Sequence, residues 1–493
     1  MTLSSSFSDL SEEQAKLLKF EAPPLTGRAA KDAPGMVNTG ALSSPNGRLR
    51  LDGWRLHPAD RAGGARRRVA FVVHKFPPES LGGTELYCWG LARALATEGH
   101  QAHIFYPTPS LVEGEERVER EGVHLWSVPL PPTREHEDPV SQYWHTFRDL
   151  GIEAAFQRFL DEVQPELVHF QHVQGVSARL IELAAPLPRI VTLHDYWYFC
   201  ANSQLIRPDR RPCEGPSAGC HNCVDCATER ADLQWMRPLR PLVALPFAYR
   251  NRYLRHLADE VDLFLAPSAF LRQKYVEHGF PAEKIVVVEN GLDVDKLAPT
   301  SQPTIAQPAV RPHFGFLGSL AWQKGVHVLI EAFNRLDERA SLTIYGSEHT
   351  FPEYAAELKR LARHPNIRFA GVVEPRQVGE ALRQIDCLVV PSLWYENSPL
   401  VIQEAYGVGV PVVASRLGAL PEKVKEDSTG RLFSPGDVDD LAAVLQDLVT
   451  HPQLLAEMSE RIVPAPSMAV HAAYLAQVYE GVVVGDRGLG TGD

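Results

Sequence analysis

The chain has 493 residues, a length that corresponds to roughly three average domains. Of these residues 44% are hydrophobic and 22% are charged, which is typical of a globular protein. Its 49 lysines and arginines against 61 aspartates and glutamates give a net charge of −12, which disfavours nucleic acid as a partner because nucleic-acid-binding proteins normally carry a basic surface. No run approaches the ~18 apolar residues of a membrane-spanning helix, so the sequence also disfavours an integral membrane protein.

Residues 1–66 are rich in Pro, Gly and Ser and lack a clear hydrophobic period. We predict a loosely ordered N-terminal extension with one short helix over residues 11–20. Acidic residues stand where a signal peptide has its apolar stretch, so we expect a cytoplasmic protein, with peripheral attachment to the inner face of the membrane as a further expectation.

From residue 67 short apolar runs alternate with helical segments, a pattern typical of a doubly wound parallel sheet. We therefore assign residues 67–300 to a Rossmann-like domain. Strands are predicted over residues 68–73, 101–106, 167–170, 189–193, 264–267 and 285–288, and helices over residues 84–98, 175–184 and 269–279.

Residues 301–312 are rich in Pro, Gln and Thr and have no regular pattern, which predicts an interdomain linker. A second alternating series makes residues 313–465 another Rossmann-like domain, and residues 466–493 a C-terminal helix and tail that could pack on either domain. Two α/β domains of this kind face each other across a cleft, where ligands bind at the strand ends. Strands are predicted over residues 314–317, 341–345, 367–370, 387–391 and 410–414, and helices over residues 325–336, 353–362, 377–384, 399–406, 437–449 and 467–479.

The strand–loop–helix unit over residues 388–406 carries the strongest functional signal. Pro399 suits the first helical position and Ser398 the N-cap. The backbone N–H groups of Leu400 and Val401 would then point out of the helix start, at the positive end of its dipole. This arrangement predicts an anion site suited to a diphosphate.

Two glutamates flank that site, Glu396 in the loop and Glu404 inside the helix. Carboxylate oxygens accept hydrogen bonds from sugar hydroxyls, although two glutamates alone are more often solvated surface charges. Here they lie within PSLWYENSPLVIQEAYGVGVPVVAS, and further landmarks occur in order along the chain. These are Gly82-Gly83-Thr84-Glu85, His194, Pro267-Ser268, Asn290-Gly291-Leu292-Asp293 and the segment from Gly318 to Gly325.

In their order and spacing, these motifs resemble the family-4 retaining glycosyltransferases of the GT-B fold over most of residues 68–460. The resemblance implies that a nucleotide-diphosphate-sugar donor binds the C-terminal domain. The acceptor, a glycan, a lipid-linked molecule or a small molecule, would bind the N-terminal domain. The resemblance further implies transfer with retention at the anomeric carbon and no cofactor or divalent ion for the chemistry.

The resemblance also implies individual roles. Glu404 would bind the nucleotide ribose, Glu396 would hold the donor sugar beside its anomeric carbon, and Lys324 would neutralise the diphosphate, whose negative charge grows as it leaves. His194 would lie near the donor sugar, although a histidine at a strand end is often only structural. Asp195 could orient the His194 ring or cap the following segment.

Six further positions complete the candidate site: Gly318, Ser319 and Asn290 for the donor, and Gly82, Gly83 and Glu85 in the acceptor-side loop. Ser319 stands where the family usually carries an arginine, and serine cannot make arginine's bidentate phosphate contact. Either another cation such as Arg416 replaces it or donor affinity is weaker. The alternative is a catalytically impaired, GT-B-like nucleotide-sugar-binding or scaffold protein, and a third, weaker interpretation is an epimerase or phosphorylase.

Five of the seven cysteines fall within residues 200–226. C-x2-C spacing lets two thiolates reach one tetrahedral ion, and four such ligands form a structural zinc site. Cysteine-bearing insertions occur in a subset of the resembled family, which favours Cys200, Cys213, Cys220 and Cys223 as ligands, with Cys226 spare. Reduced thiols, disulfides or an iron–sulfur cluster remain alternatives.

Residues 230–256 combine six arginines with several aromatic side chains. A basic, aromatic-rich stretch on an acidic protein predicts contact with an anionic membrane surface or a lipid-phosphate acceptor. The alternative is an amphipathic helix that packs on its own domain.

Overall fold

The structure is a computed structural model, and it describes residues 65–484 except 79, 81, 111–113, 134–138 and 299–310. All but the last two residues of the predicted N-terminal extension, including its helix, lie outside the described residues. So do most of the predicted linker and the end of the predicted tail.

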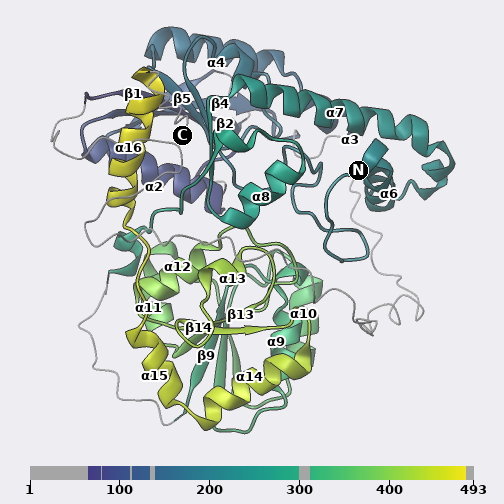
Figure 1. Cartoon of the computed structure of the whole chain (residues 1–493), viewed down its shortest axis with the longest axis vertical. Coiled ribbons are helices and arrows are strands. Elements are labelled where there is room, and N and C mark those ends of the chain that lie inside the picture. Colours follow the sequence, from purple (N-terminus) through teal and green to yellow (C-terminus); the bar gives the residue numbers. More distant parts are fainter. Residues whose placement is uncertain are drawn as a thin grey trace, which may run out of the picture. The chain divides into compact units, whose positions relative to one another are not determined.

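The N-terminal domain is built on an eight-stranded sheet in the order β3-β4-β2-β1-β5-β6-β7-β8 (Figure 1). Every neighbouring pair is parallel except β3 and β4. Its strands are β1 (Arg68–Val72), β2 (Gln101–Pro109), β3 (Glu116–Arg120), β4 (Val123–Leu130), β5 (Leu167–Phe170), β6 (Arg189–Thr192), β7 (Leu263–Ala266) and β8 (Ile285–Val287). Its helices include α2 (Gly83–Thr97), α3 (Pro139–His145), α4 (Leu150–Val163), α5 (Leu180–Leu183), α6 (His221–Arg230), α7 (Arg240–Glu260) and α8 (Ala269–Glu277).

The C-terminal domain has a six-stranded, wholly parallel sheet in the order β11-β10-β9-β12-β13-β14. The doubly wound architecture predicted for both domains is therefore confirmed. The strands are β9 (His313–Leu317), β10 (Ser341–Tyr345), β11 (Ile367–Gly371), β12 (Cys387–Val390), β13 (Val412–Ser415) and β14 (Gly430–Phe433). The helices include α9 (Val326–Phe333), α10 (Pro352–Leu361), α11 (Val378–Arg383), α12 (Leu400–Gly407), α13 (Leu420–Lys423), α14 (Val438–Thr450) and α15 (Gln453–Glu460).

Four features of the N-terminal domain differ from the predicted elements, and the first is helix α6, which lies where we predicted no element. The β3–β4 hairpin and the helices α3 and α4 occupy a stretch for which we predicted no element. The helix predicted over residues 175–184 is a single turn, α5. Among the described helices, none is both long enough and apolar enough to span a membrane.

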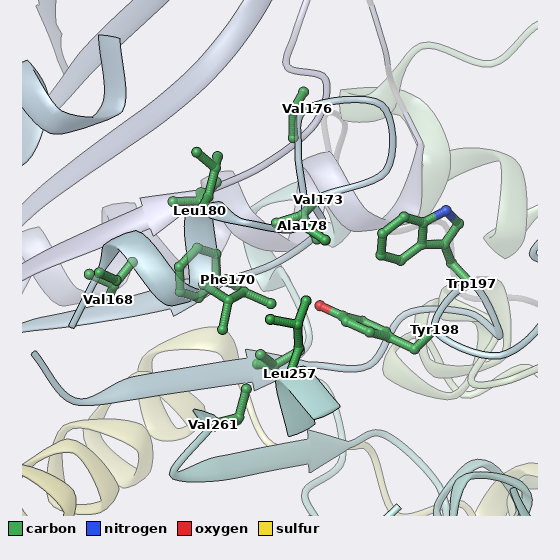
Figure 2. Close-up of a cluster of buried hydrophobic side chains, with 14 of the residues drawn as sticks. Val168, Phe170, Val173, Val176, Ala178, Leu180, Trp197, Tyr198, Leu257 and Val261 are labelled. Carbon is green, nitrogen blue, oxygen red and sulfur yellow. The ribbon is translucent and has the colours of Figure 1, made fainter. Parts of the chain in front are cut away.

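One core cluster of the N-terminal domain anchors the loop that follows β6 (Figure 2). Phe170 of β5 and Leu257 of α7 pack in this cluster together with Trp197 and Tyr198 of the loop, and all four are buried. The loop starts with His194 and Asp195, so burial of its aromatic residues holds these two polar residues at the carboxyl edge of the sheet.

The last helix, α16 (Met468–Val484), packs against α2 of the N-terminal domain (Figure 1). Its buried side chains belong to the same core cluster as β1 and α2. Two polar pairs join α16 to the domain: Tyr87 Oη of α2 is 2.7 Å from His471 Nε2, and Tyr479 Oη is 2.8 Å from Nδ1 of His169 in β5. The helix is therefore part of the N-terminal domain, although it follows the C-terminal domain in the sequence.

Lowering the pH from 7 to 5 is expected to loosen α16. Burial lowers the pKa of His169 to about 3 and that of His471 to about 4, whereas both would titrate near 6.5 once exposed. The stability that these neutral rings give is complete above about pH 6.5 and is lost as the pH falls toward the folded-state values. At pH 5 the loss is about 2 kcal/mol for each ring.

Hydrogen–deuterium exchange of peptides from α16 and α14 measures this effect, after correction for the intrinsic exchange rate. Protection of α16 should fall by at least tenfold relative to α14, whose helical residues include no histidine. Equal losses in the two helices would contradict a specific role for the buried histidines.

Candidate active site

A buried ion pair lies in the loop between β12 and α12. Glu396 is only 5% exposed, and its Oε1 accepts hydrogen bonds from Lys324 Nζ at 2.7 Å, Ser392 Oγ at 2.7 Å and Trp394 Nε1 at 2.8 Å. Lys324 also lies over the Trp394 ring, 5.1 Å from its centroid, and remains 28% exposed. Two predicted catalytic residues, 72 positions apart, are thus in direct contact.

A close approach of two loops makes this pair possible. Gly325, directly after Lys324, has φ +69°, and a Cβ atom placed on it would lie 1.9 Å from the Pro391 carbonyl oxygen. Leu393 N also donates to Gln323 O at 2.8 Å. Only glycine fits this left-handed position so close to backbone atoms. Because Gly325 has no side chain, the two loops can approach, and the Lys324 ammonium group reaches the Glu396 carboxylate.

Helix α12 starts one residue later than predicted. Pro399 is its N-cap, with ψ 115°, and the helix begins at Leu400, so the prediction of Ser398 as N-cap was wrong: an extended proline separates its hydroxyl from the first turn. Around this helix start, the buried atoms that lack hydrogen-bond partners among the described residues are Asn397 Oδ1, Ser398 Oγ, Gln403 Oε1 and Ser415 Oγ. Unpaired buried polar atoms are costly, so this cluster points to a polar ligand.

Glu404 lies farther along α12, in a separate small pocket with Asp293, Lys296 and Leu400. Burial raises the pKa of its carboxyl group; the nearby Lys296 opposes this rise and Asp293 adds to it. Leu400 also faces the N-terminal domain, where a Cβ on Gly83 would lie 3.7 Å from its Cδ1. The structure thus places Glu396 just before α12 and Glu404 inside it, in different local surroundings.

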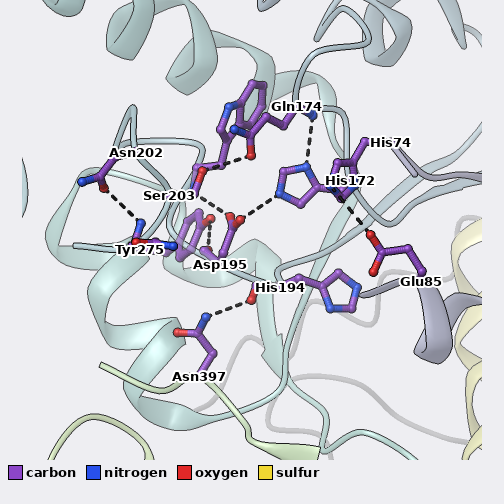
Figure 3. A network of polar contacts seen from close by, with 12 residues as sticks. His74, Glu85, His172, Gln174, His194, Asp195, Asn202, Ser203, Tyr275 and Asn397 are labelled. Atoms are coloured by element: carbon purple, nitrogen blue, oxygen red, sulfur yellow. Dashed lines mark hydrogen bonds and ion pairs between the residues drawn. The ribbon is translucent and has the colours of Figure 1, made fainter. Parts of the chain in front are cut away.

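Across from α12, the carboxyl ends of β1, β5 and β6 carry a polar network (Figure 3). His194 Nε2 is 2.9 Å from Gln171 Oε1, and burial lowers the His194 pKa to about 3, so its ring is neutral at physiological pH. Its backbone carbonyl accepts a hydrogen bond from Asn397 Nδ2 at 2.8 Å. This contact joins the strand end to the loop that holds Glu396.

The neighbouring residues have other partners. Asp195 Oδ2 is 3.0 Å from His172 Nε2, and its Oδ1 accepts from Trp197 N at 2.8 Å; of the two roles predicted for Asp195, the structure has the cap and not the His194 contact. The His172 ring lies 4.4 Å from that of His74 at a tilt of 43°, and His74 Nε2 is 4.0 Å from Glu85 Oε1.

The remaining predicted positions lie around this centre. Gly82 is the N-cap of α2 and Gly83 its first residue, and a Cβ on Gly82 would lie 2.5 Å from Glu85 Oε2. Asn290 is buried, with its carbonyl oxygen accepting from Gln403 Nε2 at 3.1 Å. Gly318 follows β9 with φ +159°, and the next residue, Ser319, is exposed.

Arg416, the predicted substitute for the missing arginine, has another partner in the structure. Its guanidinium group pairs with Glu426 Oε2 at 2.9 Å and is 57% exposed. Replacement of the family's arginine, at the position of Ser319, by Arg416 therefore stays a prediction, whereas Lys324 is a cation that contacts Glu396.

The zinc prediction is not supported. Among the described residues, which include all five cysteines of the insertion, no group of three or more His, Cys, Asp or Glu side chains is placed to hold a metal ion. Cys200 instead bonds through Sγ to Asn202 Oδ1 at 2.8 Å, and Asn251 Nδ2 lies 3.7 Å from Cys220 Sγ. The thiols nevertheless lie in one region, since burial and the other four cysteines of the insertion raise the pKa of Cys223. The ligand set Cys200, Cys213, Cys220 and Cys223 therefore has no support in the structure.

A cavity of about 800 Å³ adjoins the polar network in the N-terminal domain. It opens beside the carboxyl ends of β1, β2 and β4, and His74 lies in its wall. Ring side chains form much of the rest, namely Phe76, Tyr143, His145, Trp197 and Phe247.

Sequence reasoning missed Ser392, Trp394, Asn397 and Gln171. A usable signal existed for Gln171, because Gln171-His172 follows β5 just as His194-Asp195 follows β6. The carboxyl ends of adjacent parallel strands meet at one edge of a sheet. Polar pairs at both ends predict one shared site.

The fold is similar to those of solved glycosyltransferase structures. Sucrose-phosphate synthase of Thermosynechococcus elongatus aligns with a TM-score of 0.62 at 17% identity, covering 85% of this chain and all of the other. HepE of Anabaena, in complex with UDP and glucose, aligns with a TM-score of 0.58 at 16% identity, covering 84% of this chain and all of the other. The chain therefore has the GT-B fold, as predicted.

Two family models also match. Residues 81–296 match Glycosyltransferase Family 4 and residues 311–451 match Glycosyl transferases group 1. An uncharacterized 42.6 kDa protein in the cps region of Klebsiella pneumoniae is 23% identical over 72% of this chain and 86% of its own length. Glycogen synthase of Mycobacterium tuberculosis is 30% identical over 47% of this chain, and the match spans only 57% of that protein. The chain belongs to the family-4 glycosyltransferases, and this membership disfavours the scaffold alternative.

Proposed function

We propose that this glycosyltransferase moves a sugar from a nucleotide-diphosphate-sugar donor to an acceptor with retention at the anomeric carbon and without a metal ion. The observation that carries the proposal is the Lys324–Glu396 pair beside the start of α12. A cation and a helix N-terminus supply the two groups that a diphosphate needs. Binding of UDP and glucose to HepE supports a donor of this chemical class.

In this proposal the donor diphosphate lies against the N–H groups of Leu400 and Val401, and Lys324 turns toward it from Glu396. Glu396 keeps Ser392 and Trp394 as partners and uses its second oxygen to accept from a sugar hydroxyl. Glu404 accepts from the nucleotide ribose. The hydroxyls of the donor then donate to the carboxylates and to the amide oxygens of Asn397 and Gln403, while the hydroxyls of Ser398 and Ser415 donate to its phosphates.

The reaction breaks the bond between the anomeric carbon and the β-phosphate oxygen. It forms a bond from that carbon to the acceptor oxygen on the same face, and the acceptor proton passes to the leaving phosphate. Lys324 and the helix dipole stabilise the charge that develops on the phosphate. His194, neutral because of its burial, offers a hydrogen bond to the sugar without adding a second positive charge.

We place the acceptor in the 800 Å³ cavity, on the side of Gly82, Gly83 and Glu85. His74 connects the two, because it lines the cavity and lies 4.0 Å from Glu85. Its ring walls suit the apolar faces of a carbohydrate or an aglycone. Cytoplasmic localisation stays a prediction from the sequence.

A panel of UDP-, GDP- and ADP-sugars tests the donor site. One of them should raise the melting temperature of the full chain, and Glu404→Gln should weaken its binding by at least tenfold, since each lost hydrogen bond to a charged group is worth roughly 1.5–3 kcal/mol. Glu422→Gln provides the control: its carboxylate accepts from the backbone of α8 at Ala269 N and contributes nothing to the proposed donor site. If no nucleotide sugar stabilises the chain, the donor proposal is wrong.

A further inference from the structure

Six exposed apolar side chains gather on α3, α7 and the 3-10 turn Gln234–Leu239 before α7, each between 46% and 71% exposed. We call this set the α7 face. Three of its members on α7 are spaced i, i+3 and i+7 and therefore share one side of the helix, while the side opposite them is buried. The members of the α7 face are Trp144, Trp235, Leu239, Leu242, Leu245 and Tyr249.

Helix α3 is fixed to α7, so Trp144 belongs to the same surface. Tyr143 Oη donates to Pro246 O at 2.6 Å, and the rings of Phe147 and Tyr249 lie 5.4 Å apart. The indoles and leucines thus sit on a packed helix pair, where an exposed apolar patch marks a binding surface.

Charge indicates what covers this face. Residues 230–256 contain six arginines and one aspartate, in a chain whose net charge is −12. Arg250 is buried, and Arg237 and Arg240 pair with carboxylates of α6, so only part of this positive charge is free to meet an anionic partner. Arg252, which is exposed, continues the side of α7 that carries Leu242, Leu245 and Tyr249. Tryptophan, tyrosine and leucine beside arginine make up the composition of helices that lie in the surface of an anionic bilayer.

The α7 face is continuous with the proposed acceptor cavity. Tyr143 lines the cavity, and its ring lies 5.6 Å from that of Trp144 and 5.1 Å from that of Phe147, which in turn lies 5.4 Å from the Tyr249 ring. A molecule anchored in a bilayer under this face could therefore extend its head group into the cavity.

We propose that the α7 face binds an anionic lipid bilayer and that the acceptor is lipid-anchored, its polar head entering the cavity from the membrane surface. The membrane part stands on the α7 face alone. The acceptor part rests on the proposed function.

Sedimentation of the full chain with vesicles tests the membrane part. Binding should be strong to phosphatidylcholine vesicles that contain 30% phosphatidylglycerol and at least tenfold weaker to phosphatidylcholine alone, because arginine near an anionic surface contributes about 1 kcal/mol per residue. The double variant Leu242→Ser/Leu245→Ser should lose at least tenfold in binding to the anionic vesicles. The control Val463→Ser, at an 83% exposed position of the C-terminal segment, should bind like the parent.

Equal binding by the parent and the double variant would overturn the proposal. A second result would also overturn it: the parent is a dimer, the double variant is a monomer, and neither protein binds vesicles. A second copy of the chain would then cover the α7 face. Donor-induced stabilisation should be the same in both proteins, which shows that the variant is folded.

The acceptor part is tested by incubating the protein with a donor labelled in its sugar and a total polar lipid extract of the source cells. The label should move into the organic phase, with at least tenfold less for the double variant. Label only in the aqueous glycan fraction would overturn the lipid-anchored acceptor while leaving the glycosyltransferase proposal intact. Failure to bind any donor would instead count against the proposed function.

Discussion

Replacing Lys324 with alanine is expected to reduce sugar transfer by about 10²–10³-fold, the loss typical when one group that stabilises transition-state charge is removed. Transfer to water can be measured without knowing the acceptor, as release of nucleoside diphosphate from the donor that stabilises the chain best. The variant should also be about 1–3 kcal/mol less stable, because Glu396 would keep a buried charge with two donors in place of three.

Two further variants separate catalysis from folding. Glu396→Gln keeps an oxygen for Ser392 and Trp394 but removes the charge, so it should fold and still lose at least 100-fold in turnover. Lys359→Ala removes a lysine whose partner is Glu348 at the exposed surface and should change stability by less than about 1 kcal/mol. If Lys324→Ala kept more than a tenth of the parent rate, the ion pair would be structural and the proposed chemistry would be wrong.

The central strands were predictable because they are buried on both faces and read as continuous apolar runs. The predicted strand over residues 167–170 matches β5 to the residue. The opposite case is β3, with the sequence ERVER and every side chain exposed. Its pairing with β4 depends on backbone hydrogen bonds at a sheet edge. Such hydrogen bonds require no buried side chains, so β3 has no hydrophobic pattern from which it could be predicted.

The candidate site shows the same division. Glu396 and Lys324 could each be assigned from a motif, but their contact depends on the approach of Gly325 to Pro391, which no spacing rule contains. The start of α12 was one residue off, since both Ser398 and Pro399 are acceptable next to a helix and only the backbone angles decide. The zinc prediction gains no support for a related reason: C-x2-C sets a separation along the chain, whereas a metal site requires ligand atoms that converge on one point.

The approach of the two loops leads to the second large effect. Gly325→Ala should destabilise the C-terminal domain by about 3 kcal/mol or more and separate Lys324 from Glu396. Two costs add: a non-glycine residue at φ +69° costs roughly 1–2 kcal/mol, and the new Cβ would overlap the Pro391 carbonyl oxygen, which must then shift. Thermal unfolding and nucleoside diphosphate release, measured on the same samples, report the two consequences.

Gly371→Ala isolates the first cost. Gly371 has φ +76°, close to that of Gly325, and a Cβ on it would meet nothing within 4 Å among the described residues, so this variant should lose only about 1–2 kcal/mol and retain donor turnover. A similar loss of stability in both variants would mean that the backbone angle alone matters. Full turnover in Gly325→Ala would show that the loop contact does not position Lys324, because the ammonium group would then reach the diphosphate without it.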